Sequence, residues 1–145
     1  LRTRRSRLLL AAAASLVVGV GIGAGAVVLG TGDDDGAAAA ALDPLDDSGA
    51  TGEARVVERD DGTLVLEVDL TAAAPREGFY EVWLLDEAVE DLVSLGVVRG
   101  GGEVALTLPS GLDLGEYPIV DVSVEPLDGD PGHSGVSVAR GMLES

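Results

Sequence analysis

The pattern of apolar and polar positions divides the chain into one unbroken apolar stretch and a later region of alternating residues. Residues 8–30 carry Ser15 as their only polar side chain. A helix of this length reaches about 34 Å, enough to cross a hydrocarbon core of about 30 Å. Four of the nine basic residues precede it: Arg2, Arg4, Arg5 and Arg7. Because such arginines stay in the cytoplasm, we expect one transmembrane helix over residues 8–30, a cytoplasmic segment over residues 1–7, and an extracytoplasmic remainder.

The same stretch has a competing interpretation as a cleavable export signal, with Ala24, Gly25 and Ala26 as a small-residue cleavage site. Its length favours the uncleaved anchor, since a signal peptide has an apolar region of about 7 to 15 residues. Gly19 and Gly23 lie four residues apart on one face of the predicted helix. Small residues at that spacing allow two membrane helices to approach closely, so a homodimer through this face is one hypothesis.

Residues 31–52 are rich in acids, alanine and glycine and contain no base. This composition predicts a flexible, solvated linker, in which residues 37–42 could form a short helix. Linkers of this type are also where proteases cut.

Residues 53–145 read as short strands separated by turns, which is typical of an all-β domain. We predict a small immunoglobulin-like β-sandwich of about seven strands, preceded by the one transmembrane helix. The strands are expected at residues 54–59, 64–70, 78–86, 92–98, 104–108, 119–125 and 136–140.

The strand predicted at residues 78–86 carries the largest side chains of the domain. Phe79 and Trp83 fall on one of its faces, and Tyr80 falls on the other. A central strand of this kind belongs in the core, so we expect Trp83 to be buried rather than to stack on a carbohydrate.

Composition and charge exclude several classes of function. The chain has no cysteine, which excludes a thiolate zinc site and a cysteine nucleophile. His133 is the single histidine, which excludes a histidine metal cluster. The formal net charge is −17, and all twenty-six acids follow residue 30 while only five of the bases do. Such a surface repels phosphates, so we expect no direct nucleic-acid partner.

Two groups in the loop at residues 127–135 are candidates for chemistry. Asp128 and Asp130 flank Gly129 and could hold calcium, but an EF-hand loop needs more oxygen ligands, and a turn is the favoured interpretation. His133 and Ser134 could form a base and a nucleophile, but adjacent residues of an extended segment point apart. We therefore predict no catalytic, cofactor-binding or metal-binding residue, and no enzyme activity.

A set of short motifs in the predicted domain resembles one known family. The motifs are Gly78, Tyr80, Glu81, Val82, Trp83 and Leu84; Val93, Ser94, Leu95 and Gly96; Val122, Ser123, Val124, Glu125 and Pro126; and Asp128, Gly129, Pro131, His133, Ser134, Gly135, Arg140 and Gly141. Together they resemble the extracytoplasmic domain of anti-sigma-K factors of the RskA type. The similarity covers about residues 54–143 and the apolar stretch before them.

The resemblance implies a membrane-tethered, extracytoplasmic regulatory domain that controls release of a sigma factor by stepwise proteolysis. The expected partners are the membrane, the site-1 and site-2 type proteases, and the sigma factor. The family binds the sigma factor through a cytoplasmic domain before the membrane helix, and only residues 1–7 precede the apolar stretch here. We therefore expect the sigma-binding domain to be absent from this chain. The alternative is an anchored or secreted β-sandwich that binds an envelope partner through the loop at residues 127–135.

Overall fold

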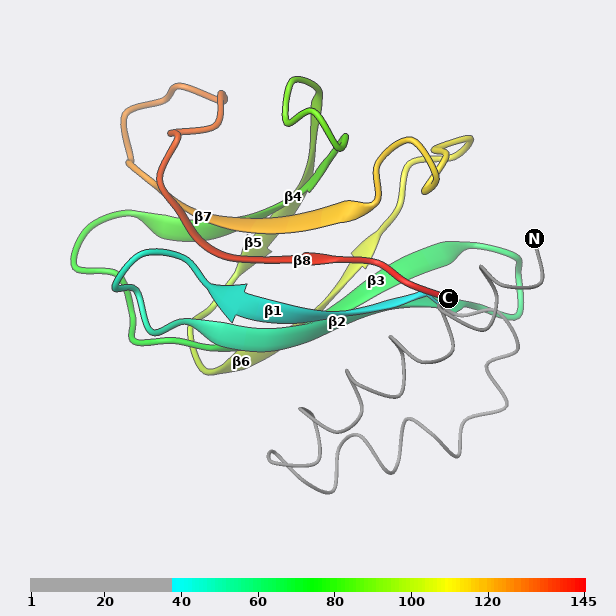
Figure 1. The fold of residues 1–145 in the computed structure, drawn as a ribbon, viewed down its shortest axis with the longest axis horizontal. Helices are drawn as coiled ribbons and strands as arrows, with labels where there is room; N and C mark the ends of the chain where they lie inside the picture. The colour runs from blue at the N-terminus through cyan, green and yellow to red at the C-terminus, as the bar shows by residue number, and fades with distance from the viewer. Residues whose placement is uncertain (1–37) are drawn as a thin grey trace.

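The computed structural model describes residues 38–145, and this part of the chain contains eight β-strands (Figure 1). The strands are β1 (Ala39–Pro44), β2 (Thr51–Glu58), β3 (Leu64–Thr71), β4 (Phe79–Leu85), β5 (Leu92–Val98), β6 (Gly102–Thr107), β7 (Ile119–Glu125) and β8 (Ser137–Met142). All seven predicted strands are present, and the all-β class is confirmed. The eighth strand is β1.

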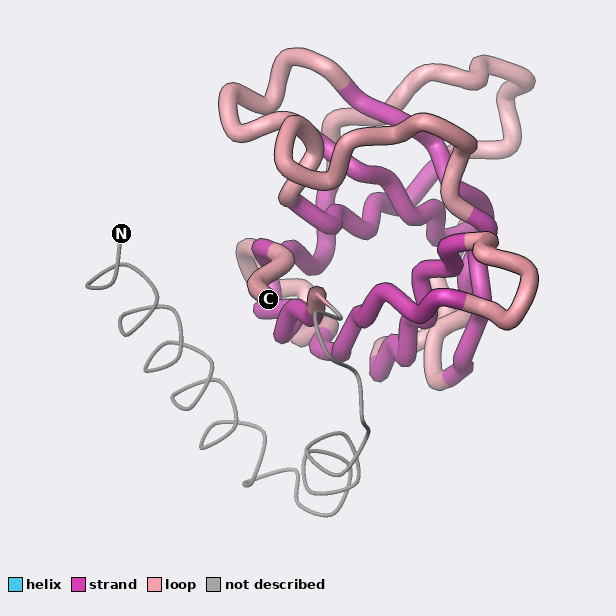
Figure 2. Tube along the Cα trace, turned by 90° about the vertical axis from the view of Figure 1, so that its right-hand side faces the viewer, coloured by secondary structure: helices cyan, strands magenta, loops and turns pink. Residues whose placement is uncertain are grey.

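The strands form one sheet in the order β5-β4-β7-β8-β1-β2-β3-β6, with every neighbouring pair antiparallel. The sheet curls around one interior, as Figure 2 shows. Its two edge strands, β5 and β6, contact each other. A Cβ atom on Gly96 of β5 would lie only 2.9 Å from Leu106 Cδ2 of β6. The architecture is therefore a nearly closed sheet, intermediate between a barrel and a sandwich, whose halves are joined through β1.

Part of the predicted linker is a strand. Residues 39–44 belong to β1, which lies in the middle of the sheet between β2 and β8. The prediction of a linker through residue 52, and of a short helix in it, is therefore wrong for these residues. Ala40 and Leu42 alternate with exposed neighbours and are buried. The run has weak strand propensity, so its conformation comes from pairing with residues that are distant in sequence.

The main core lies inside the curled sheet. Val82 and Leu84 of β4 and Val120 and Val122 of β7 are all fully buried there. A second apolar cluster, formed by Trp83, Leu85 and Ile119, lies on the opposite face of the same two strands. The predicted burial of Trp83 is confirmed, but the ring belongs to this outer cluster and not to the main core.

The predicted transmembrane helix over residues 8–30, and the interface through Gly19 and Gly23, lie outside the described residues. Within residues 38–145, no helix has the length and apolar character needed to span a bilayer.

Candidate functional site

The outer face of β7 carries three buried polar side chains in a row. Asp121 and Ser123 are fully buried, and Glu125 is only 3% exposed. They alternate with valines that face the main core, as the two-residue period of a strand requires. Burial of two carboxyl groups is costly unless each has hydrogen-bond donors, so the donors around them define the candidate site.

Asp121 accepts hydrogen bonds from three side chains. Its Oδ2 atom accepts from His133 Nε2 and from Ser137 Oγ, each at 2.8 Å. Its Oδ1 atom accepts from Arg140 Nε at 2.8 Å. The Arg140 side chain is 32% exposed, so its charge compensates the buried carboxylate while part of the guanidinium still meets water.

A bulge in β8 places two of these donors on one face. Where the pairing with β7 shifts register, β8 carries Val138 as an extra residue. Residues three positions apart in a regular strand point to opposite faces, but the extra residue brings both Ser137 and Arg140 toward Asp121. The carbonyl of Val138 accepts hydrogen bonds from Leu45 N–H at 2.9 Å and from Ser48 Oγ at 2.6 Å.

His133 connects the β7–β8 loop to this carboxylate. Its Nδ1 atom accepts a hydrogen bond from the N–H of Gly135 at 2.8 Å, which requires a lone pair on Nδ1. The ring therefore carries its proton on Nε2 and donates it to Asp121. The ring also contacts Trp83, with a centroid distance of 5.0 Å and an interplanar angle of 54°. With both nitrogens engaged, the imidazole has no free lone pair to act as a general base.

The remaining polar groups under the loop are paired as well. Trp83 Nε1 donates to Ser123 Oγ at 2.9 Å. Both carboxylate oxygens of Glu125 accept from the Ser134 N–H at 2.9 Å, and Ser134 Oγ donates to the Val124 carbonyl at 2.7 Å. The later half of the loop is thus fixed to the outer face of the sheet, and it covers the Trp83 cluster.

The two predicted candidates in the loop have separate roles. Asp128 Oδ1 accepts the N–H of Asp130 at 2.9 Å, and Asp130 Oδ1 accepts the N–H of Gly132 at 2.8 Å. Their carboxylates form two successive turns, which confirms the turn interpretation. His133 bonds to Asp121 instead of to the Ser134 hydroxyl, so the structure does not bring a base and nucleophile together.

Sequence reasoning missed the pairing of Asp121 with His133. The available signal was the alternation of Asp121, Ser123 and Glu125 with valines in the predicted strand, because polar residues on an alternate face normally meet solvent. Nothing in the local pattern indicates that a loop folds back over that face.

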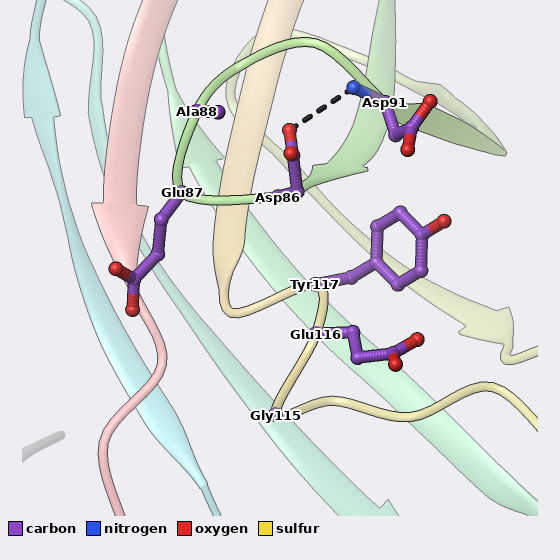
Figure 3. Close-up of a pocket in the computed structure, with 7 residues that line it drawn as sticks. All are labelled: Asp86, Glu87, Ala88, Asp91, Gly115, Glu116 and Tyr117. Carbon is purple, nitrogen blue, oxygen red and sulfur yellow. Dashed lines mark hydrogen bonds between the residues drawn. The ribbon is translucent and has the colours of Figure 1, made fainter.

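A shallow acidic hollow at the turn between β4 and β5 is the second region with grouped polar residues (Figure 3). Its lining residues are Asp86, Glu87, Ala88, Asp91, Gly115, Glu116 and Tyr117. Asp86 Oδ1 accepts the N–H groups of Asp91 and Glu90 at 3.0 and 2.8 Å, and these bonds lower the pKa of its carboxyl group below its ordinary value. Asp86 therefore serves as the hydrogen-bond acceptor of the turn.

Metal ligation finds no support in the part of the chain that the structure describes. Across residues 38–145, no three His, Asp or Glu side chains are arranged to hold a metal ion. The same range has no buried side-chain nitrogen or oxygen without a hydrogen-bond partner. The buried polar groups therefore act by fastening a loop and two strands together.

Fold and cluster together define a small all-β domain whose buried carboxylates anchor a loop over the outside of the sheet. Residues 8–137 match the family described as anti-sigma-K factor rskA, C-terminal, and the chain belongs to that family. The match covers the apolar stretch and extends to the start of β8, which confirms the resemblance seen in the motifs. Neither a curated protein nor a solved structure gave a match.

Proposed function

We propose that this chain is the membrane-tethered, extracytoplasmic regulatory part of an anti-sigma factor, and that it controls release of the sigma factor through regulated proteolysis. The observation that carries the proposal is the family match over residues 8–137, which joins the apolar stretch and the β-domain in one unit. The arginines before residue 8 support a cytoplasmic amino terminus. The sigma factor is then held by a cytoplasmic domain on the amino-terminal side of the span.

In this proposal the β-domain is not an enzyme but a substrate and regulator of site-1 and site-2 type proteases. The engagement of both nitrogens of His133 supports a non-catalytic role. The span itself offers glycines at positions such as Gly19 and Gly23, which lower helix propensity by about 1 kcal/mol each relative to alanine and ease the unwinding that an intramembrane protease requires. The same two glycines are the proposed contact of a homodimer.

The proposed placement can be tested with single cysteines, because the natural chain has none. In intact cells, a membrane-impermeant maleimide should label a Ser145→Cys variant and leave a Ser6→Cys variant unlabelled until the cells are opened. Labelling of Ser6→Cys in intact cells would reverse the proposed topology.

The proposed proteolysis is tested with the chain tagged at both ends. Deletion of the intramembrane protease should make a membrane-bound amino-terminal fragment accumulate, because the first cut still occurs and the second does not. An unchanged fragment pattern would contradict regulated proteolysis.

A binding module is the alternative, and one observation favours it. Leu127 is 83% exposed and Val136 is 55% exposed, both in the β7–β8 loop. This loop lies at the opposite end of the sheet from the start of β1 (Figure 1). If the loop binds an envelope partner, Leu127→Ser should abolish capture of that partner without lowering the melting temperature. Unchanged capture would contradict the binding module, and only the regulatory proposal would remain.

A further inference from the structure

We propose that β1 is a protease recognition strand that strand β8 masks, and that release of β8 is the event that permits the first cut. This inference rests on the proposed function and names its cleavage site and regulation. The site is the run Ala39–Pro44, with alanines at its first three positions. The reagents are a protease of the class that cuts beside small residues, and water.

A protease binds its substrate as an extended chain and pairs with the substrate backbone, as one strand adds to another. β1 already has the extended conformation and small side chains, but both of its edges are occupied. β2 pairs along one edge from Ala39 to Leu42. On the other edge, β8 pairs with Asp43 and Pro44. The folded domain therefore presents no free edge of β1.

The β8 edge has the shorter regular ladder. This ladder consists of two register pairs with β1, against four for β2. A separate bridge joins Ala39 to Glu144, with N–H to carbonyl distances of 2.9 Å and 2.8 Å in the two directions. Release of residues 138–144 thus frees one edge of β1 while its pairing with β2 stays intact.

Gly141 fits the close approach of β8 to β1. A Cβ atom at this position would lie 2.0 Å from the carbonyl oxygen of Ala41, which is backbone and cannot move aside alone. Any larger residue must push β8 off β1. The position therefore allows the proposed release to be produced by one substitution.

The proposed chemistry is simple hydrolysis. The protease breaks one backbone amide of β1 and adds water across the C–N bond. The tethered fragment gains a carboxylate, and the β-domain gains an amino group. The tether then ends in a short stub outside the span, which is the substrate of the second protease in the proposed function.

The test is limited proteolysis of the full 145-residue chain in detergent, with elastase as the probe and mass spectrometry to locate the cuts. Gly141→Ala should raise the rate of cutting within residues 39–44 about tenfold. Gly100→Ala is the matched control, since a Cβ there would lie 2.6 Å from the carbonyl oxygen of Ala72, just after β3, which does not pair with β1. Equal acceleration by both variants at equal melting temperature would overturn the proposal.

A disulfide between β1 and the end of the chain tests the opposite case, in which β8 cannot be released. Ala39 and Glu144 form a doubly hydrogen-bonded antiparallel pair, a geometry that suits a disulfide. The double variant Ala39→Cys/Glu144→Cys should lose cutting within residues 39–44 when oxidised and regain it when reduced. Equal rates of cutting in the oxidised and reduced forms would contradict masking by β8.

The same variants separate this inference from the proposed function. If cells cut the chain but the Gly141→Ala and locked forms are processed at the wild-type rate, regulated proteolysis stands and masking by β8 fails. If elastase shows the masking but no form is cut in cells, the masking stands and the proposed function fails.

Discussion

The two faces of strands β4 and β7 are held together by different forces. The inner face is apolar, and residues such as Val82 and Val122 pack in the main core. The outer face combines the indole of Trp83 with the buried carboxylates of Asp121 and Glu125. Packing on the inner face is supplied by the strands themselves, whereas the outer face is complete only when the β7–β8 loop folds back over it.

The two faces are therefore vulnerable to different substitutions. Truncation of a side chain on the inner face leaves a cavity and loses buried apolar area. The cost in stability scales with the number of atoms removed. Truncation of a polar side chain on the outer face also leaves buried donors without acceptors. This costs more stability than the number of atoms removed would predict. Substitutions on the two faces separate these two behaviours.

The largest effect is expected for Trp83→Ala. Loss of the indole removes the cover of Leu85 and leaves Ser123 Oγ without its donor, so unfolding should become easier by roughly 3 to 5 kcal/mol. Urea titration followed by circular dichroism measures the change. In the unchanged chain, fluorescence from this single tryptophan should be blue-shifted, and a spectrum typical of a water-exposed indole would contradict its burial.

The next effect is expected for Asp121→Ala, at about 3 kcal/mol, because His133, Ser137 and Arg140 lose their common acceptor. The matched inner-face variant is Val122→Ala, for which burial and cavity formation predict about 2 kcal/mol. Both substitutions remove side chains of similar size, so the difference between their costs reports the hydrogen bonds of Asp121. A smaller cost for Asp121→Ala than for Val122→Ala would remove the distinction between the faces.

A moderate effect is expected for His133→Ala, at about 1 to 2 kcal/mol, since the hydrogen bonds with Asp121 and Gly135 and the contact with Trp83 are lost. Leu127→Ala in the same loop should change stability by less than about 0.5 kcal/mol, because its side chain is mostly exposed. Melting temperatures of the two variants measure this contrast. Equal melting temperatures would mean that the loop is not held by His133.

The smallest effect concerns the exposed turn at Asp86. Hydrogen bonds from the N–H groups of Asp91 and Glu90 lower the pKa of this carboxyl group in the folded state. A lowered pKa stabilises the fold above the unfolded value of about 3.9, and the stabilisation is lost as the pH falls through the folded value. The difference in melting temperature between the wild type and Asp86→Ala should therefore be constant near neutral pH and shrink below about pH 4. A difference that grows in acid would refute the assigned role.

The strands could be predicted from the sequence where alternation is local. β5 and β7 begin and end as expected, and the β2–β3 hairpin follows from the Gly-containing turn at Gly62, whose φ is 83°. β1 could not be predicted, because Ala39, Ala40 and Ala41 carry no strand signal of their own and depend on partners distant in sequence.

Prediction of the site is limited in the same way, because contacts between distant residues leave no local pattern. The turns at Asp128 and Asp130 follow from their residue types, and both were expected. The contact of His133 with Asp121 depends on the path of a loop and on a bulge at Val138, and neither has a periodic signal. Short-range pattern thus explains the inner face, while the outer face required the folded chain.

Amide hydrogen exchange of the full chain tests most directly whether the loop is part of the folded core. The N–H of Ser134 donates to Glu125, and the N–H of Gly135 donates to His133. Both amides should exchange as slowly as those of strand β7, while the amide of Leu127 in the same loop exchanges fast. Fast exchange of Ser134 and Gly135, at the rate of Leu127, would contradict the claim that this loop completes the outer face.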